Sequence, residues 1–394
     1  MLLANKTSLR FPVFLASVLT ESLNNSKRLQ SSYSSGGHIR QVNNNNNRVG
    51  FISDRGTDSW FSRSSRFSTM EQHSSVPRAQ SKSIETKETT EGNAEKKTMA
   101  FDLKAYMASK VKAVNEALDS AVPIHYPEKI HEAMRYALFG GGKRLCSVVS
   151  IAACELFGGK QETVMPIAIA MEMIHDASQV HDDLPCMDDS DLRRGRPTTH
   201  IVYGEATAVL TGDALLCKAF EHIATETKGV SSENVLRVIA RLGRSVGSKG
   251  MVAGQVVDLL SSADQSVTLE TLEFIHLHKT AILVESSIVC GAIVGGASDE
   301  DIERLAKFGR TLGLLFQVVD DLLDVTKTTE ELGKPAGFDA LTDKATYPKL
   351  LGLEKTKVFA EELLRKARMQ ISVFDQVKAA PLMAIVDFVL NRPR

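Results

Sequence analysis

The chain has 394 residues and a formal net charge of −1, a balance that gives no indication of binding to nucleic acid or to an anionic membrane surface. Its hydrophobic content of 43% and charged content of 24% are ordinary for a globular protein. The five cysteines fit neither a disulfide framework nor a zinc site, and no apolar run reaches the roughly 20 residues that a membrane-spanning helix needs.

Residues 1–70 differ in composition from the rest of the chain. They contain three acidic residues against nine lysines and arginines, fourteen serines and an asparagine run at 43–47. A segment that is basic, serine-rich and poor in acidic residues is typical of an organellar transit peptide, and low apolar content argues against a packed core. We predict a targeting segment at 1–70, for plastids or alternatively for mitochondria, and a polar linker at 71–98. A disordered tail and a secretory signal are the competing interpretations.

From about Phe101 onward, apolar residues recur at three- and four-residue intervals, as they do on the buried face of an amphipathic helix. The same spacing predicts further helices over 128–139, 145–157, 163–181, 205–226, 233–248, 270–295, 299–325 and 354–373. Glycine or proline separates most of these segments, and alternating β patterns are nearly absent. The predicted fold class is therefore all-α, with residues 99–394 forming one large bundle whose site lies between core helices.

Three consecutive glycines, Gly140 to Gly142, precede Lys143 and Arg144 at the predicted start of a helix. Backbone N–H groups at a helix N-terminus and adjacent cations form an anion-binding site, so this segment predicts a place for a phosphate group. His175 lies two helical turns before the next acidic motif and on the same face as its first aspartate. It is either a structural histidine or a part of the same phosphate pocket.

An acidic cluster of Asp182, Asp183 and Asp188 ends one long apolar helix. Pro185 removes a backbone donor and breaks that helix. The break could bring Asp188 back toward Asp182, whereas six residues of regular helix would separate the two by about 9 Å.

A second acidic cluster, Asp320, Asp321 and Asp324, ends another long apolar helix. Asp320 and Asp324 are four residues apart, so they share one face of that helix. Lysines, among them Lys334 and Lys344, follow this cluster, and the basic stretch Arg193-Arg194-Gly195-Arg196 follows the first.

Each cluster alone is compatible with a solvated helix end, but the pair is costly unless something positive lies between them. Three carboxylates within about 5 Å of one another repel by roughly 3 kcal/mol per pair at an effective dielectric constant near 20. Oxygen ligands without cysteine or histidine favour Mg²⁺, which often bridges carboxylates to a phosphate. Arginine in turn binds phosphate oxygens bidentately. The two clusters therefore predict Mg²⁺ as the cofactor and a phosphorylated substrate.

The order of the motifs resembles that of the trans-isoprenyl diphosphate synthases, and in particular plant geranylgeranyl diphosphate synthases. The resemblance covers about residues 101–394. It rests on HDDLPCMD followed by DLRRGRPT, on GQVVDL at 254–259, on HKTA at 278–281, on FQVVDDLLD at 316–324, and on LGKPAG and TDKATYPKL further along. Membership would imply an isoprenoid synthase-type bundle with a deep central apolar pocket, assembled as a homodimer.

The resemblance also implies a reaction and a set of site residues. Mg²⁺ would pull on the diphosphate of an allylic substrate, isopentenyl diphosphate would attack the resulting cation, and a proton would be lost. The metal ligands would be Asp182, Asp188 and Asp320, with Asp183, Asp321 and Asp324 close by as further catalytic residues. The allylic diphosphate would contact Arg193, Lys279, Thr280, Gln317, Lys334 and Lys344, and isopentenyl diphosphate would contact Lys143, Arg144, His175 and Arg194.

One position in the glycine-rich segment departs from the family pattern. Cys146 stands where the pattern Lys-Arg-x-Arg-Pro has a diphosphate-binding arginine. A charge-assisted hydrogen bond contributes roughly 1.5–3 kcal/mol, which corresponds to about 10- to 150-fold in affinity. We therefore expect weakened binding of isopentenyl diphosphate.

A second departure concerns the length of the product. Ala177 and Ser178 lie one turn before the first aspartate cluster, where they would line the path of the growing chain. Many plant relatives have methionine at the position of Ala177, so alanine leaves space for about one further isoprene unit. Met173 and Ile174, a turn below, are the next candidates to close the path; Ala177 is otherwise a simple packing variation.

The predicted function is condensation of isopentenyl diphosphate with dimethylallyl, geranyl and farnesyl diphosphates to geranylgeranyl diphosphate. A geranylfarnesyl (twenty-five-carbon) diphosphate synthase is one alternative. A weakly active or regulatory subunit that pairs with a related chain is another, which Cys146 favours and the intact aspartate clusters oppose. A terpene synthase would share the metal-assisted ionisation but typically lacks a second basic diphosphate site. A metal phosphohydrolase would give no reason for the second cluster.

Overall fold

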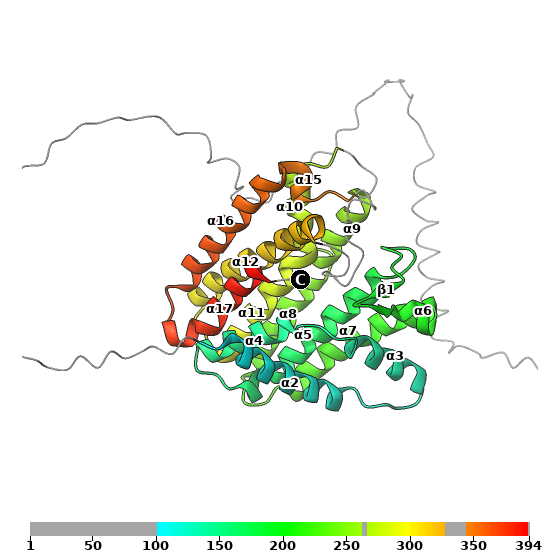
Figure 1. Cartoon of the computed structure of the whole chain (residues 1–394). Coiled ribbons are helices and arrows are strands. Elements are labelled where there is room, and N and C mark those ends of the chain that lie inside the picture. The colour runs from blue at the N-terminus through cyan, green and yellow to red at the C-terminus, as the bar shows by residue number, and fades with distance from the viewer. Residues whose placement is uncertain (1–100, 262–265, 328–343, 393–394) are drawn as a thin grey trace, which may run out of the picture. The chain divides into compact units, whose positions relative to one another are not determined.

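The computed structural model describes residues 101–261, 266–327 and 344–392, and nearly all of this part of the chain is helical (Figure 1). The all-α fold class is confirmed for these residues. The targeting segment and linker predicted within 1–98, and Lys334, lie outside the described residues.

The elements follow one another along the chain in this order. Within the described residues, the helices begin with α2 (Leu103–Ala121), α3 (Glu128–Leu138), α4 (Leu145–Leu156) and α5 (Gln161–Asp182). A short antiparallel pair, β1 (Leu192–Arg193) and β2 (Arg196–Pro197), precedes α6 (Thr199–Tyr203), α7 (Glu205–Glu226), α8 (Ser232–Val246) and α9 (Met251–Ser261). Next, α10 (Leu269–Ile275), the π-helical turn η2 (His276–Ala281) and α11 (Ile282–Gly295) are continuous. The last helices are α12 (Asp299–Thr326), α15 (Tyr347–Leu351), α16 (Leu353–Ile371) and α17 (Gln376–Asn391).

The helix ends follow signals in the sequence. Asp102 caps α2 by accepting a hydrogen bond from the Ala105 N–H at 3.0 Å. Ser298 caps α12 in the same way. Gly296 ends α11 with a φ of 85°, a conformation that glycine adopts without steric cost. Each of the predicted segments is helical in the structure, with its ends within a few residues of those expected.

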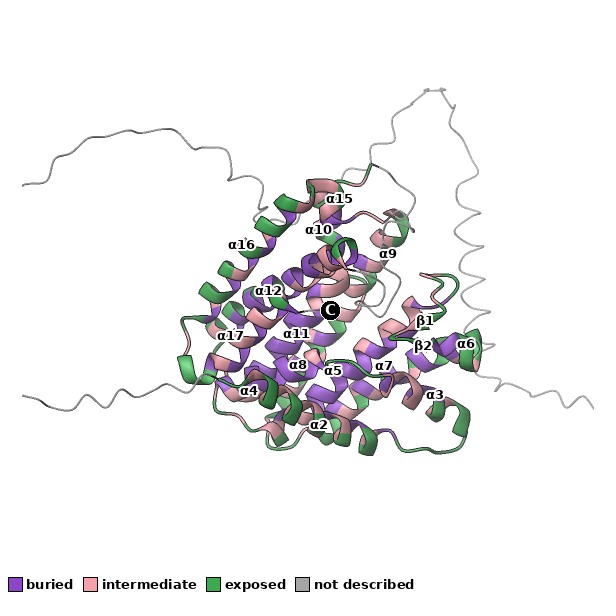
Figure 2. Cartoon of the chain, in the orientation of Figure 1, coloured by how far each residue is buried: buried purple, intermediate pink, exposed green. Residues whose placement is uncertain are grey.

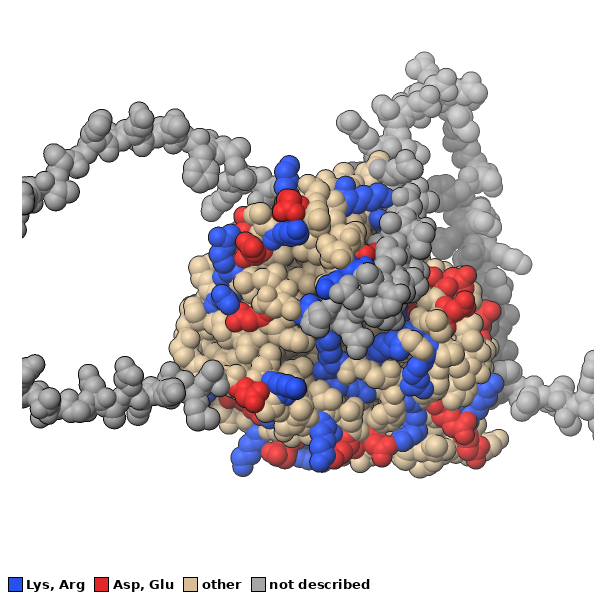
Figure 3. Space-filling view, in the orientation of Figure 1, with Lys and Arg blue, Asp and Glu red and all other residues tan. Residues whose placement is uncertain are grey.

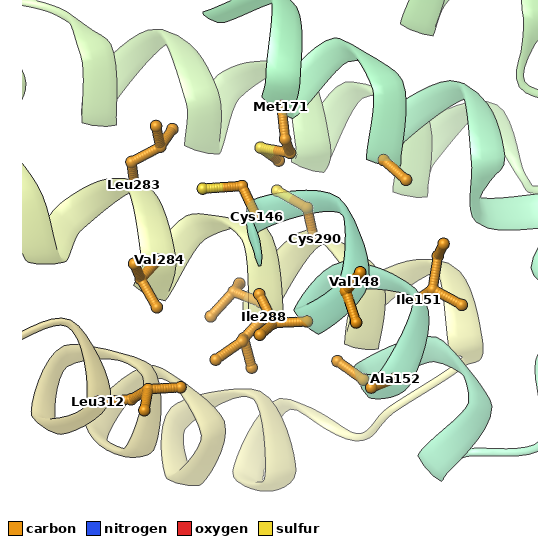
Figure 4. Close-up of a cluster of buried hydrophobic side chains, with 14 of the residues drawn as sticks. Cys146, Val148, Ile151, Ala152, Met171, Leu283, Val284, Ile288, Cys290 and Leu312 are labelled. Carbon is orange, nitrogen blue, oxygen red and sulfur yellow. The ribbon is translucent and has the colours of Figure 1, made fainter. Parts of the chain in front are cut away.

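The core lies around α11, which packs against α4, α5, α8 and α12. Every residue of this helix from Leu283 to Ile293 is buried (Figure 2). Figure 4 shows part of this core, in which Ile288 and Cys290 of α11 face side chains of α4 and α5. The stretch Leu269–Gly295 is long and apolar enough to cross a membrane, and 67% of its most apolar window is buried within the protein. Such burial is typical of the central helix of a bundle.

Candidate active site

A cavity of about 1120 Å³ opens among the helices that surround α11. Its walls come from α4, α5, α7, α8, α9, η2, α11 and α12, together with the loops before α4 and around β1. Lysine and arginine side chains gather near the middle of the face shown in Figure 3. Asp182 from α5 and Asp320 from α12 both line the cavity, so the structure brings the two predicted aspartate clusters to one pocket.

The first cluster is shaped by the break at the end of α5. The Asp188 N–H donates to the Asp182 carbonyl oxygen at 2.9 Å, and the Met187 N–H donates to the Leu184 carbonyl oxygen at 2.8 Å. The chain therefore turns back on itself after Leu184, and the predicted return of Asp188 toward Asp182 is confirmed.

Two lysines connect the carboxylates of this cluster to a third one on α9. Lys279 Nζ lies 3.2 Å from Asp182 Oδ1 and 2.7 Å from Asp258 Oδ2. Lys344 Nζ lies 3.0 Å from Asp188 Oδ1 and 4.0 Å from Asp258 Oδ2. Burial would lower the pKa of Lys279, but the adjacent aspartates outweigh it and raise the pKa overall. Lys279 is therefore charged, and both lysines lie against the carboxylates of the cluster.

Asp258 and Gln255 are site residues that sequence reasoning did not single out. Gln255 Nε2 donates to Asp182 Oδ1 at 2.6 Å, and Gln255 and Asp258 are three residues apart on α9. The preceding Gly254 explains their approach, because an added Cβ would lie 2.3 Å from the Lys279 backbone nitrogen on η2. The GQVVDL motif holds the sequence signal for this contact. Its glycine permits α9 to approach η2 closely, and its glutamine and aspartate make the polar contacts there.

Arg193 is held by Asp183 rather than projecting freely into the cavity. Arg193 Nε lies 2.8 Å from Asp183 Oδ2, and Nη2 lies 2.7 Å from Oδ1. Burial would lower the pKa of Arg193, yet the hydrogen bonds to Asp183 raise it overall. Asp183 itself is buried and does not line the main cavity.

Within the second cluster only Asp320 faces the cavity. Asp321 is buried, accepting from Gln317 Nε2 at 3.1 Å and from the Tyr347 N–H at 3.0 Å. Asp324 is also buried and does not line the cavity. Although Asp320 and Asp324 are one helical turn apart, packing encloses Asp324 and leaves only Asp320 at the pocket.

Thr280 and Gln317 are adjacent on the cavity wall, where Thr280 Oγ1 donates to Gln317 Oε1 at 3.2 Å. Thr280 and Lys279 belong to η2, a π-helical turn. Such turns occur frequently at functional sites, and this one presents both residues to the same cavity.

The basic end of the cavity lies at the glycine-rich segment. Arg194 donates to the Gly141 carbonyl oxygen and, at 3.2 Å, to Gln179 Oε1. Gln179 Nε2 in turn lies 3.3 Å from His175 Nε2. A Cβ at Gly142 would lie 3.0 Å from the Arg194 guanidinium, so this glycine makes room for the arginine. Burial lowers the pKa of Arg194, although arginine remains charged at physiological pH.

Arg144 has a different environment from its neighbour Lys143. Its side chain is 4% exposed and lies 3.4 Å from Glu172 Oε2 and 3.3 Å from Asp176 Oδ2. It also donates to Asn115 and to the Leu138 carbonyl oxygen. These partners occupy the guanidinium, so Arg144 ties the glycine-rich segment to α5.

Cys146 lies at the base of this region. It is buried, lines the cavity, and packs beside Met171 and Cys290 (Figure 4). Burial, and then the nearby Glu172 carboxylate, raise the pKa of its thiol. A neutral thiol cannot replace the charge of an arginine.

The remaining cavity wall is apolar. Ala177, Ser178 and Ile174 of α5 line it, as do Leu216 of α7 and Val246 of α8. Met173 is fully buried and is not part of this wall. Of the two residues expected below Ala177, Ile174 is therefore the one that faces the cavity.

The carboxylates fit Mg²⁺ as part of a larger ligand set. In the described part of the chain, no three acidic, histidine or cysteine side chains are close enough to hold a metal ion alone. Asp182, Asp188 and Asp320 are each within 3.2 Å of a lysine or arginine nitrogen. Mg²⁺ usually takes one or two carboxylates and completes its shell with water and phosphate oxygens. The donors present suit that arrangement once a diphosphate supplies the other oxygens.

Comparison with known proteins gives a consistent result. The family model described as polyprenyl synthetase matches residues 127–380. The chain is 60% identical over 293 residues to a chloroplastic geranylgeranyl pyrophosphate synthase of Catharanthus roseus, covering 74% of this chain and 82% of that protein. It is 58% identical over 296 residues to a chloroplastic geranylfarnesyl diphosphate synthase of Leucosceptrum canum, covering 75% and 81%. The crystal structure of a geranylgeranyl pyrophosphate synthetase from Pyrococcus horikoshii superposes with a TM-score of 0.68 at 28% identity, covering 74% of this chain and 98% of that one.

Proposed function

The chain belongs to the polyprenyl synthetase family and is a prenyltransferase, and on this premise we propose that it makes geranylgeranyl diphosphate. The substrates are isopentenyl diphosphate and the allylic dimethylallyl, geranyl or farnesyl diphosphate. The observation that carries the proposal is the meeting of Asp182 and Asp320 at one cavity that also has a separate basic end.

Asp182, Asp188 and Asp320 are the proposed metal ligands, with Gln255 orienting Asp182. These carboxylates would hold Mg²⁺, which would supply positive charge to the departing diphosphate. Asp183, Asp321 and Asp324 act indirectly, because their carboxylates hold neighbouring groups in place or lie buried behind the wall.

The cations of the cavity are assigned to two diphosphates. Lys279 and Lys344 exchange their carboxylate partners for oxygens of the allylic diphosphate, with Thr280, Gln317 and Arg193 alongside; Lys334 remains a proposal from the sequence. Lys143, His175 and Arg194 bind isopentenyl diphosphate, and Arg144 supports that segment. The apolar wall excludes water, so the allylic cation meets the double bond of isopentenyl diphosphate instead of a solvent molecule.

The proposal is tested by incubating the full chain with Mg²⁺, labelled isopentenyl diphosphate and each allylic primer in turn. Chromatography of the dephosphorylated alcohols should give a twenty-carbon product from every accepted primer, and a chelator should abolish it. A cyclic hydrocarbon formed from the primer alone would instead identify a terpene synthase. A chain that is active only after mixing with a related subunit would support the heterodimer alternative over the homodimer.

Product length gives a further prediction, and it concerns Ala177. One isoprene unit extends by about 5 Å, close to the 5.4 Å pitch of a helix, so alanine in place of a methionine-sized side chain opens roughly one unit of depth. We expect a substantial twenty-five-carbon fraction beside the twenty-carbon product. Ala177→Met should shift the distribution toward twenty carbons, whereas Ala177→Ser, which changes little volume, should leave it as it is. Only twenty-carbon product from both the native chain and Ala177→Met would place the end of the path elsewhere.

Targeting gives another prediction. The two plant relatives compared above carry the word chloroplastic in their names, and we propose plastids as the location of this chain. Residues 1–70 fused to a fluorescent reporter should direct it to plastids in plant cells. A reporter that stays in the cytosol or enters mitochondria would contradict the proposal.

A further inference from the structure

The turn that carries Arg194 has a backbone conformation that arginine seldom adopts. Strands β1 and β2 pair Arg193 with Arg196. The two residues between them, Arg194 and Gly195, form the turn and have φ angles of 53° and 73°, the pattern of a type I′ hairpin turn. Glycine accepts a positive φ without steric cost, whereas an arginine there is strained. A strained residue keeps its conformation only where surrounding contacts fix it.

The contacts of the Arg194 side chain cannot fix the turn when substrate is bound. In the structure Arg194 donates to the Gly141 carbonyl oxygen and to Gln179. The same side chain lines the main cavity, where we assign it to isopentenyl diphosphate. A diphosphate that takes up these donors removes them from Gly141 and Gln179. The turn therefore needs a second attachment that the substrate does not disturb.

Arg196 supplies such an attachment from the other strand of the hairpin. Its Nη1 donates to the Phe139 carbonyl oxygen at 3.1 Å, and its guanidinium carbon lies 4.4 Å from the centroid of the Tyr136 ring. A cation over the face of an aromatic ring is attracted by the ring's quadrupole. The Tyr136 hydroxyl in turn donates to the Pro197 carbonyl oxygen at 2.7 Å. The hairpin and the end of α3 are therefore joined by hydrogen bonds in both directions.

Arg196 makes these contacts away from the main cavity. It lines a separate small cavity of about 40 Å³ at the hairpin and is not part of the main cavity wall. Its cross-strand neighbour is Arg193, and like charges at such a pair of positions repel. The two guanidinium groups have different partners, which are Asp183 for Arg193 and the Phe139 carbonyl oxygen for Arg196. The two strands of the hairpin are therefore held independently.

We propose that Arg196 is a positioning residue, which fixes the turn at Arg194 against the glycine-rich segment so that Arg194 and Lys143 meet the same diphosphate group. This inference rests on the proposed function of the site and deepens it. When Arg194 leaves Gly141 to bind isopentenyl diphosphate, the contact of Arg196 with Phe139 keeps the turn in place. The Arg194 guanidinium is then preorganised, so binding does not have to order it.

The test compares Arg196→Gln with Arg135→Gln in the full chain. Arg135 of α3 is the matched control, because its guanidinium lies over the Phe139 ring at 5.1 Å and donates to the Val122 carbonyl oxygen at 2.8 Å, away from the hairpin. Arg196→Gln should raise the KM for isopentenyl diphosphate about tenfold, as expected for the loss of one charge-assisted hydrogen bond from Arg194. It should leave kcat and the KM for farnesyl diphosphate within about twofold. Arg135→Gln should leave all three values unchanged.

A double-mutant cycle tests whether Arg196 acts through Arg194. In an Arg194→Gln background, the further change Arg196→Gln should raise the KM by less than about twofold, because the side chain that it positions is already absent. Arg196→Lys should bring the KM to within about threefold of the native value, since an ammonium can also donate to the Phe139 carbonyl oxygen and lie over the ring. Tyr136→Phe keeps the ring and removes one hydrogen bond, so it should give a smaller rise even if Arg196→Gln folds poorly.

An unchanged KM for isopentenyl diphosphate in both Arg196→Gln and Tyr136→Phe would overturn the proposal. So would equal rises in Arg196→Gln and Arg135→Gln, or independent effects of Arg194 and Arg196 in the cycle. Calorimetric titration with isopentenyl diphosphate measures the same affinities without turnover. A native chain that binds isopentenyl diphosphate but forms no prenyl product would therefore refute the proposed reaction, while the titrations still decide the role of Arg196.

Discussion

Replacing Asp182 with alanine is expected to lower kcat by about 10³-fold or more, with little effect on folding. Metal ions contribute several kcal/mol of charge stabilisation in such reactions, and about 1.4 kcal/mol corresponds to a tenfold change in rate. Lys279 would keep Asp258 as its partner at 2.7 Å, so no buried cation loses its only counter-ion. The measurement is steady-state turnover at saturating Mg²⁺, accompanied by the thermal unfolding midpoint.

The matched control for this variant is Asp387→Ala, which removes a carboxylate that pairs with Arg368 at the surface. It should leave turnover unchanged. Asp320→Asn should be as inactive as Asp182→Ala, because its amide is a poor metal ligand but keeps an acceptor oxygen for Arg392. Normal turnover in either cluster variant would contradict the proposed metal site.

The substitution Cys146→Arg is expected to lower the KM for isopentenyl diphosphate about tenfold or more, with little change for the allylic substrate. A charge-assisted hydrogen bond contributes roughly 1.5–3 kcal/mol, and a neutral thiol contributes none of it. The position is buried beside Glu172, so the longer side chain must extend toward the cavity. Overpacking typically costs about 1–3 kcal/mol of stability, which the unfolding midpoint would reveal.

Cys146→Ala is the control here, because it removes the thiol without adding charge and should leave both KM values as they are. If Cys146→Arg folds normally and neither KM changes, the side chain at position 146 does not reach the substrate.

The fold could be predicted from the sequence because its helices are long and their apolar periodicity is strong. Short or irregular elements gave no such signal. The two-residue strands at 192–193 and 196–197 are too short to show alternation. The π-helical turn at 276–281 inserts an extra residue into a pattern that otherwise continues as an α-helix. It nevertheless decides that Lys279 and Thr280 face the cavity together.

The site was predictable where chemistry is concentrated in adjacent residues and not where it depends on distant contacts. Asp182 and Asp320 stood out as carboxylates at the ends of apolar helices. The burial of Asp321 depends on the backbone of Tyr347, which is 26 positions further along the chain. Likewise, nothing near Arg392 in the sequence indicates Asp320 as its partner.

Arg144 is the converse case, because the sequence predicted its ligand but could not show its contacts within the protein. Its place in a basic motif predicted a phosphate contact, which stays a prediction: Arg144 lines the cavity, and its guanidinium also pairs with Glu172 and Asp176. Removing one partner from such a buried group would leave an uncompensated charge, so the three side chains depend on one another. Periodicity could place all three residues on helices but could not show that those helices bring them together.

The stoichiometry of the reaction tests the central claim most directly. With the full chain, Mg²⁺, farnesyl diphosphate and carbon-labelled isopentenyl diphosphate, the total inorganic diphosphate released is counted against the isopentenyl units incorporated. A condensing enzyme with two diphosphate sites should release one inorganic diphosphate per unit incorporated, and should release almost none without isopentenyl diphosphate. Rapid release from farnesyl diphosphate alone, with no incorporation, would contradict the account.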